Sequence, residues 1–300
     1  MAYALSTPRR RTSSAREHAK RSADIIELRR LNYLQVCDSV FPVGAFALSN
    51  GMETFVQYDI IQSNRDFADY LHNYLEVAAY KEIGQMVIAG RIARDRRLSP
   101  TGFTRKITEL DSLATALQAP REIREGQHKM CLRMIKLADQ MESNPLQPMD
   151  VRHGGSARHT VNMRHNAMDS ASSTPSVGRT IPHVDTYKAL IDTGHCLGLH
   201  AIVMGLFAAD KEPDLREAAI TYCYSLISAL TVCAVKAVEL KAVPISQYAG
   251  QIALRDSFPA VVDAVDLAFT LHPDDLGISG AYLDIASMQH ETLYSRLYMS

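Results

Sequence analysis

The sequence predicts an all-α protein: a single helical domain of about eight to ten helices. Apolar residues recur three and four positions apart along most of the chain, which is the spacing of one face of an α-helix. No stretch shows the apolar and polar alternation of a half-buried strand between paired turn signals. No proline interrupts the chain between Pro42 and Pro100, so helices in that region meet no break.

Composition favours a soluble globular protein and excludes several other classes. Of the 300 residues, 47% are hydrophobic and 22% are charged, which is unlike disordered, collagen-like or multi-span membrane proteins. The net charge of −1 gives no electrostatic reason to expect nucleic-acid binding. Five irregularly spaced cysteines without a CxxC motif indicate a reducing compartment, and we expect a cytoplasmic protein.

Residues 1–30 form a basic N-terminal tail that we expect to be disordered. They hold eight Lys or Arg against three acidic residues, and they lack the apolar run of a secretory signal. Their composition also resembles an organelle transit peptide, but Glu17, Asp24 and Glu27 interrupt that pattern. The helical domain is therefore expected to span residues 31–300.

The densest local pattern is LQVCDSVFPVGAFALSNGMETFVQ at residues 34–57. Pro42 ends a first helix, and Gly44 permits a tight turn. Ser49 or Asn50 then caps a second helix, in which Glu53 can complete a capping box. Helix, turn and capped helix account for the segment in structural terms alone.

Four amphipathic helices are expected between this segment and residue 141. Residues 64–80 form the first of them, with Asn64 as the N-cap. The four apolar stripes are Phe67, Tyr70, Leu71, Tyr74, Leu75 and Ala78; Ile83, Met86, Val87 and Gly90; Ile107, Leu110, Ala114 and Leu117; and Met130, Met134, Leu137 and Met141.

Residues 141–183 are expected to be a disordered insertion. These 43 residues contain no Phe, Trp or Tyr, and Ser, Pro, Gly and Asn make up 16 of them. The segment therefore has too little apolar surface to offset the entropy of ordering. His153, His159 and His165 are its metal-ligand candidates, because imidazole binds nickel, zinc and copper. The alternative is a flexible loop without a metal.

The helical pattern resumes near Thr186 and continues to the end of the chain. A Gly- and Ala-rich run at 194–209 allows close helix approach, and a long helix is expected at 214–241. Its 18 residues 218–235 carry no charge, which is near the lower limit for a membrane span. Their Thr, Tyr and Ser side chains favour a buried helix instead, and we expect no membrane association.

The sequence lacks the common catalytic and cofactor motifs. It contains no GxxxxGK[ST], GxGxxG, HExxH or GxSxG motif and no zinc-finger spacing of Cys and His. We therefore expect no catalytic residues and no cofactor of the protein's own.

The arrangement LQxxDSxFPxGxFxxSxGxE that begins at Leu34 closely resembles the signature of the urease accessory protein F family (UreF). Further segments resemble the same family in order: PREIREGQHKMCLRMI at 120–135, the run 195–206, VPISQYAGQIAL at 243–254 and MQHETLYSRLYMS at 288–300. There are departures as well. Leu48 stands where several members have His or Tyr, and Gln127 and Cys131 replace a usual Ser and Gly.

The resemblance implies an all-α homodimer that is not an enzyme. Such proteins bridge a UreD/UreH-type urease-binding accessory protein and a UreG-type nickel-carrying GTPase, so that nickel reaches apo-urease with GTP hydrolysis. Nickel and GTP are then handled by the partners. Two alternatives remain: a helical nickel metallochaperone that uses the histidines of the insertion, and a generic helical adaptor.

Partner binding is assigned to the first motif and to the chain end. Aromatic residues and arginine are enriched at interface hot spots, and a free chain end is usually mobile, so we expect the C-terminal tail to be ordered by binding. The alternative is a terminal helix packed on the body. The expected partner-binding residues are Pro42, Gly44, Phe46, Ser49, Gly51, Glu53, His290, Glu291, Tyr294, Ser295, Arg296 and Leu297.

Overall fold

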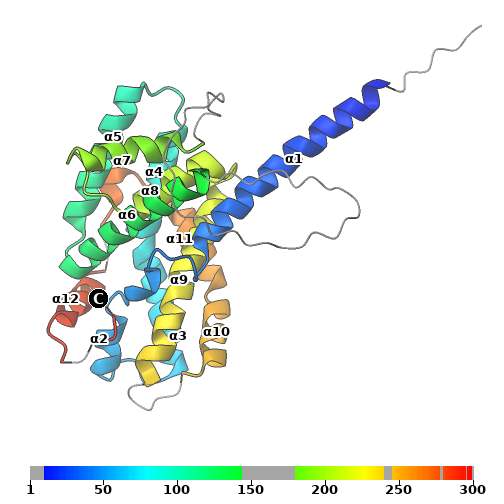
Figure 1. The fold of residues 1–300 in the computed structure, drawn as a ribbon. Coiled ribbons are helices and arrows are strands. Elements are labelled where there is room, and N and C mark those ends of the chain that lie inside the picture. Colours follow the sequence, from blue (N-terminus) through cyan, green and yellow to red (C-terminus); the bar gives the residue numbers. More distant parts are fainter. Residues whose placement is uncertain (1–9, 144–179, 240–244, 278–279, 295, 299–300) are drawn as a thin grey trace, which may run out of the picture.

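The computed structural model describes residues 10–143, 180–239, 245–277, 280–294 and 296–298, and it is helical without strands over these ranges (Figure 1). The all-α prediction is confirmed. The α-helices are α1 (Arg10–Cys37), α2 (Met52–Gln57), α3 (Asn64–Ala79), α4 (Glu82–Arg94), α5 (Pro100–Leu117), α6 (Arg121–Ser143), α7 (Pro182–Asp192), α8 (His200–Lys211), α9 (Leu215–Glu239), α10 (Gln247–Asp256), α11 (Phe258–Thr270) and α12 (Ala281–His290), and the 3-10 helices are η1 (Ala45–Ala47) and η2 (Pro273–Asp275).

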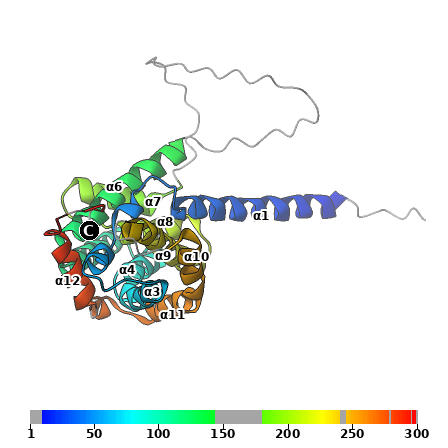
Figure 2. The ribbon, with the colours of Figure 1, turned by 90° about the horizontal axis from the view of Figure 1, so that it is seen from below.

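Helix α1 includes most of the segment that we expected to be a disordered tail. It begins at Arg10, and only residues 1–9 of the expected tail lie outside the described residues. From Arg10 to Cys37 the sequence has neither Gly nor Pro, so nothing in it breaks a helix. Tyr33, Val36 and Cys37 are buried and anchor the C-terminal end of α1, while its N-terminal part projects from the body (Figures 1 and 2).

The predicted amphipathic helices correspond to α3, α4, α5 and α6. At the start of α3 the N-cap is Ser63 and not Asn64, because the Ser63 hydroxyl accepts a hydrogen bond from the Asp66 amide at 3.2 Å. The expected insertion at 141–183 is shorter than predicted, since α6 extends to Ser143 and α7 begins at Pro182. The metal-ligand candidates His153, His159 and His165 lie outside the described residues.

The centre of the body is the pair of helices α4 and α8, which share the most extensive helix contact. Gly205 of α8 makes this approach possible: a Cβ atom at this position would lie 2.1 Å from the Met86 carbonyl oxygen of α4. The two backbones therefore pack directly against each other, and the remaining helices surround them (Figure 2).

Helix α9 contains the uncharged stretch noted in the sequence. Within the described residues, Leu215–Lys236 is the one segment long and apolar enough to cross a membrane by length and composition, and 56% of its apolar window is buried inside the protein. Side chains along α9, including Tyr222, Cys223 and Ile227, belong to the core. Helix α9 is thus packed as a core helix of the body.

Candidate functional site

The segment before α2 turns sharply at two glycines. Gly44 has φ +89° and Gly51 has φ +81°, which is a conformation that favours glycine. Gly51 is the N-cap of α2, so neither Ser49 nor Asn50 caps this helix. The predicted capping box is wrong, because Glu53 occupies the second helical position and its carboxylate bonds to groups near the chain end.

Helix α2 packs closely against α12, which comes from the other end of the sequence. A Cβ atom on Gly51 would lie 2.9 Å from the Cβ of Ala286 and 3.1 Å from the Leu283 carbonyl oxygen. The Thr54 hydroxyl donates to the Ala286 carbonyl at 2.8 Å. The close approach at Gly51 therefore aligns the last residue of α12 with the start of α2.

That last residue, His290, lies between two carboxylates. Its side chain is completely buried. The Nε2 atom lies 2.9 Å from Oε2 of Glu53 in α2, and the Nδ1 atom lies 2.8 Å from Oε2 of Glu122 in α6. The His290 imidazole therefore connects three helices, α2, α6 and α12. We refer to Glu53, His290 and Glu122 as the carboxylate–histidine cluster.

The chain end docks on the same cluster. The backbone amides of Leu297 and Tyr298 donate to the Glu53 carboxylate at 2.8 and 3.2 Å. Arg296 donates to Oε1 of Glu122 at 2.9 Å. The expectation of a poorly ordered tail is wrong for residues 296–298, because a buried carboxylate holds their amides. They do not extend α12 either, and Leu297 is 49% exposed.

The electrostatics of the cluster favour the charged forms. Burial acts to raise the pKa of Glu53, but hydrogen bonds from His290 and from the two tail amides outweigh it and lower the pKa. Burial acts to lower the pKa of His290, but hydrogen bonds to both carboxylates outweigh it and raise the pKa. The cluster is thus held together by charge-assisted hydrogen bonds, which are about twice as strong as neutral ones.

The structure brings together some of the predicted partner-binding residues and separates others. Glu53, His290, Arg296 and Leu297 meet at the cluster, and Gly51 lies beside them. Ser49 is buried, and its hydroxyl is 3.4 Å from the Glu53 amide. The other predicted residues lie away from the cluster. Gly44 lies beside Arg133, and Glu291 accepts a hydrogen bond from Arg121 at 2.9 Å. Exposed side chains are those of Pro42, Phe46 and Tyr294, and Ser295 lies outside the described residues.

Sequence reasoning missed Glu122, Cys233 and Tyr298. Glu122 belongs to the family-like segment 120–135, and that was the signal for it. Cys233 of α9 donates to the Phe46 carbonyl at 3.1 Å, and the Tyr298 hydroxyl donates to the Cys233 carbonyl at 3.0 Å. No local pattern marks Cys233, because its role depends on two segments far away in the sequence.

Apolar side chains are exposed on α12 and on the chain end that follows it. Tyr282, Ile285 and Met288 repeat every third residue on α12 and are about half exposed. Leu297 and the fully exposed Tyr294 follow them along the chain. We call these five residues the α12 surface. Helix α12 and the chain end lie on one side of the body, and α10 lies on the opposite side (Figures 1 and 2).

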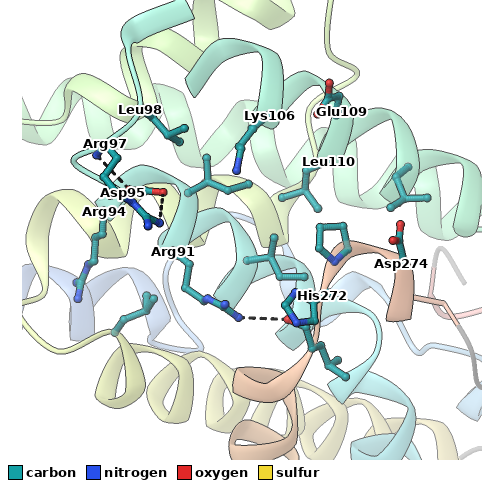
Figure 3. A pocket seen from close by; sticks show the side chains of 16 residues that line it. Arg91, Arg94, Asp95, Arg97, Leu98, Lys106, Glu109, Leu110, His272 and Asp274 are labelled. Carbon is teal, nitrogen blue, oxygen red and sulfur yellow. Dashed lines mark hydrogen bonds and ion pairs between the residues drawn. The ribbon is translucent and has the colours of Figure 1, made fainter. Parts of the chain in front are cut away.

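A separate cavity lies between α4, α5 and the turn at His272 (Figure 3). Its volume of about 880 Å³ is within the range of small-molecule pockets. Arg91 donates to the Leu271 carbonyl at 3.2 Å, and Arg97 pairs with Asp95 at 2.8 Å. Arg91 therefore ties α4 to the segment before η2, whereas the Arg97–Asp95 pair is local to the loop after α4. None of the predicted site residues that the structure describes lines the cavity.

Comparison with known proteins identifies the family. A family model described as UreF matches residues 61–257, which is about two thirds of the chain. The chain belongs to the UreF family. Curated UreF relatives match over nearly their whole length. The urease accessory protein UreF of Arthrobacter sp. (strain FB24) is 26% identical over 89% of this chain and 95% of its own.

Two further UreF relatives give the same result. The urease accessory protein UreF of Streptococcus salivarius (strain 57.I) is 26% identical over 90% of this chain and 94% of its own. That of Lachnoclostridium phytofermentans is 28% identical over 90% of this chain and 98% of its own. The sequence-based assignment to UreF is confirmed, and with it membership in a family named for accessory rather than catalytic proteins.

Proposed function

We propose that this UreF family member is a non-enzymatic scaffold in urease maturation. It bridges a UreD/UreH-type urease-binding protein and a UreG-type nickel-carrying GTPase, so that nickel insertion into apo-urease is coupled to GTP hydrolysis. The proposal extends the family assignment to named partners. It also includes a homodimer, a cytoplasmic location, and nickel and GTP held by the partners and not by this chain.

One observation carries the proposal. Three family-like segments, 34–57, 120–135 and 288–300, are far apart in the sequence, yet Glu53, Glu122 and His290 join them at one buried cluster. The cluster fixes the docked tail to Glu53 of α2, and α12, which supplies His290, exposes apolar side chains. A half-exposed apolar surface on a rigid support is suited to binding another protein.

We assign the urease-binding partner to the α12 surface. The double variant Ile285→Arg, Met288→Arg places two charges on it without changing buried residues. Leu197→Arg, in the loop between α7 and α8, is the matched control because Leu197 is similarly exposed. Burying an unpaired charge is costly, so we expect the double variant to bind the UreD/UreH-type protein at least about tenfold more weakly, equivalent to ~1.4 kcal/mol.

Binding is measured by biolayer interferometry, with circular dichroism as the check on folding. The proposal requires that Leu197→Arg binds like the unmodified protein. Equal binding by the double variant would reject the α12 surface, and no binding by the unmodified protein would reject the bridging role and favour a generic adaptor.

The metallochaperone alternative has its own test. Nickel titration of the isolated protein by calorimetry is expected to give no stoichiometric site. A site that disappears when residues 144–179 are deleted would instead assign nickel to the histidines of the insertion, His153, His159 and His165.

A further inference from the structure

The charges of residues 91–106 are strongly unbalanced. These residues hold six cationic side chains and one acidic side chain, although the net charge of the whole chain is only −1. They run from the last turn of α4 into the first part of α5. The cationic residues are Arg91, Arg94, Arg96, Arg97, Arg105 and Lys106, and the acidic residue is Asp95. This part of the surface therefore attracts anionic groups.

Within the described residues, only one of these six cations forms an ion pair with a carboxylate. Arg97 pairs with Asp95 at 2.8 Å. Arg91 donates to the Leu271 carbonyl at 3.2 Å, and Arg94 donates to the Pro213 carbonyl at 3.1 Å. Backbone carbonyls thus hold these two guanidinium groups in place without cancelling their charge. The cations that form no ion pair with any described acidic side chain are Arg91, Arg94, Arg96, Arg105 and Lys106.

The cationic segment borders the cavity of about 880 Å³ between α4, α5 and the turn at His272. Several apolar side chains that line this cavity are buried: Ile88, Leu110, Leu215 and Leu271. In Figure 3 the labelled arginines and Lys106 gather on one side of the cavity, whereas Glu109 and Asp274 lie on the other side. The cavity therefore combines an apolar lining with a cationic side and an acidic side.

We propose that this cavity binds an acidic segment of another protein that carries a large apolar side chain. The apolar side chain enters the cavity, and neighbouring Asp or Glu side chains of the segment lie against Lys106 and the arginines. Burial of the apolar side chain provides affinity, and the complementary charges speed association and fix the register. Because Glu109 and Asp274 repel other carboxylates, the charges also favour one orientation of the segment.

Other occupants fit the cavity less well. The segments of this chain outside the described residues are basic or nearly uncharged: residues 144–179 hold four Arg and two Asp, and residues 1–9 hold one Arg and no acidic residue. A membrane surface cannot fill a concave cavity with its flat array of headgroups. Duplex DNA offers phosphates but nothing apolar for the cavity, and single strands stack on aromatic side chains. No Phe, Tyr or Trp lines this cavity.

The cavity shares no residue with the carboxylate–histidine cluster or with the α12 surface. An acidic segment that binds here therefore leaves the surface assigned to the urease-binding partner free. The two binding sites can be tested independently, and the cavity does not depend on the proposed function.

The test uses the full-length protein and the peptide Asp-Glu-Leu-Trp-Glu-Asp with blocked ends. Because the protein contains no Trp, the fluorescence anisotropy of the peptide's indole reports binding directly. The titration is done in about 0.05 M NaCl, where surface charges are weakly screened. We expect the acidic peptide to bind at least about tenfold more tightly than the neutral peptide Asn-Gln-Leu-Trp-Gln-Asn. The peptide Asp-Glu-Ala-Ala-Glu-Asp, which lacks the apolar side chains, should not displace it at the same concentration.

Two variants locate the binding, and one control accompanies them. Lys106→Glu places a like charge against the peptide and should weaken its binding at least about tenfold. Lys129→Glu makes the same change at an exposed lysine of α6 outside the cavity, and it should bind like the unmodified protein. Leu98→Ala removes part of the apolar lining, so it should weaken the acidic and the neutral peptide alike, by about threefold or more. Circular dichroism checks that each variant is folded.

Any of four results would overturn this binding site. They are no binding of the acidic peptide, equal binding of the neutral peptide, displacement by the peptide without apolar side chains, and unchanged binding by a folded Lys106→Glu variant. If phosphatidylserine vesicles or a DNA duplex bind instead, and this binding is lost in Lys106→Glu, the cations serve a membrane or a nucleic acid and the proposal is wrong. Because no urease-maturation partner is present, these outcomes leave the bridging role untouched.

Discussion

At the scale of single residues, Glu53 and His290 have roles that local sequence reasoning identifies only in part. Both were expected to be functional, but Glu53 was given a capping role within its own helix. In the structure its carboxylate bonds to residues about 240 positions later in the chain, at His290, Leu297 and Tyr298. Helical spacing predicts which face of a helix is buried, but it does not predict which distant residue lies opposite.

The first prediction concerns how much the buried Glu53 carboxylate contributes to the stability of the fold. Glu53→Gln keeps the shape of the side chain but leaves His290 with one charged partner. Breaking a buried ion pair costs about 3–5 kcal/mol, so we expect a loss of about 3 kcal/mol in the free energy of unfolding, measured by urea denaturation at pH 6. Glu125→Gln is the control, since the pairs that Glu125 makes with Arg121 and Lys129 are exposed and 4.0 Å long.

An exposed pair contributes about 0–1 kcal/mol, so Glu125→Gln should unfold almost like the unmodified protein. If the two variants lose equal stability, the carboxylate–histidine cluster does not hold the protein together at Glu53.

At the scale of helices, the sequence predicts well which segments are helical, but it predicts less well where each helix begins and ends. Helices α3 to α6 follow from their apolar stripes, but Ser63 and not Asn64 caps α3. The helical state of residues 10–30 was not predicted, because no amphipathic stripe marks these residues in the sequence. The close approach of α4 and α8 was anticipated only as a possibility at glycines, since a glycine does not specify its neighbour.

The second prediction tests that helix pair. Gly205→Ala places a methyl group 2.1 Å from the Met86 carbonyl oxygen, and forcing an extra carbon into a packed core costs about 1–3 kcal/mol. Gly102→Ala is the control. Gly102 lies in α5, and a Cβ atom added there would have the Ser99 hydroxyl oxygen as its nearest neighbour, at 3.3 Å. Thermal unfolding should show a lower Tm for Gly205→Ala.

For Gly102→Ala, replacement within a helix gains up to about 1 kcal/mol, so its Tm should stay the same or rise. Equal melting of Gly205→Ala and the unmodified protein would mean that the two helices are further apart than described.

The third prediction separates α12 from the tail. A chain that ends at Leu293 keeps His290 but loses three charge-assisted hydrogen bonds, so it should lose about 1–3 kcal/mol. A chain that ends at Met288 also loses His290 and leaves Glu53 and Glu122 without it, so it should lose more, about 3–5 kcal/mol. Differential scanning calorimetry measures both.

Identical melting of the two shortened chains would show that His290 adds nothing beyond the tail. If both melt like the full chain, the docked tail contributes no stability.

At the scale of the whole molecule, the sequence predicts the fold class and the family, but not how the two chain ends meet. The family-like segments carry the assignment because each holds several matching residues in order. Their assembly into one cluster depends on the packing of α2, α6 and α12, which no single segment encodes. For the same reason the α12 surface is evident only in three dimensions.

The fourth prediction concerns residues 144–179. The segment's two ends meet in the fold: the Thr180 amide donates to Glu142 at 3.2 Å, and Lys211 bonds to both residues. Replacing 144–179 by a short Gly-Ser linker should therefore preserve the helix content and change the free energy of unfolding by no more than about 1 kcal/mol, because loop closure depends weakly on length. Circular dichroism and urea denaturation measure this.

A control deletion that also removes Glu142 and Thr180 should destabilise the protein, since it leaves the buried Lys211 without its acidic partner. If removing residues 144–179 alone lowers the helix content, the fold of the helical domain depends on this segment, which contradicts the prediction.

The central claim is that one UreF molecule connects two partners. The most direct measurement is size-exclusion chromatography with light scattering on the UreD/UreH-type protein and the UreG-type GTPase, with and without this chain. We expect the two partners to elute in one complex only when the chain is present, with its Ile285→Arg, Met288→Arg variant retaining the GTPase alone. Co-elution of the partners without the chain, or binding of one partner that displaces the other, would contradict the bridging role.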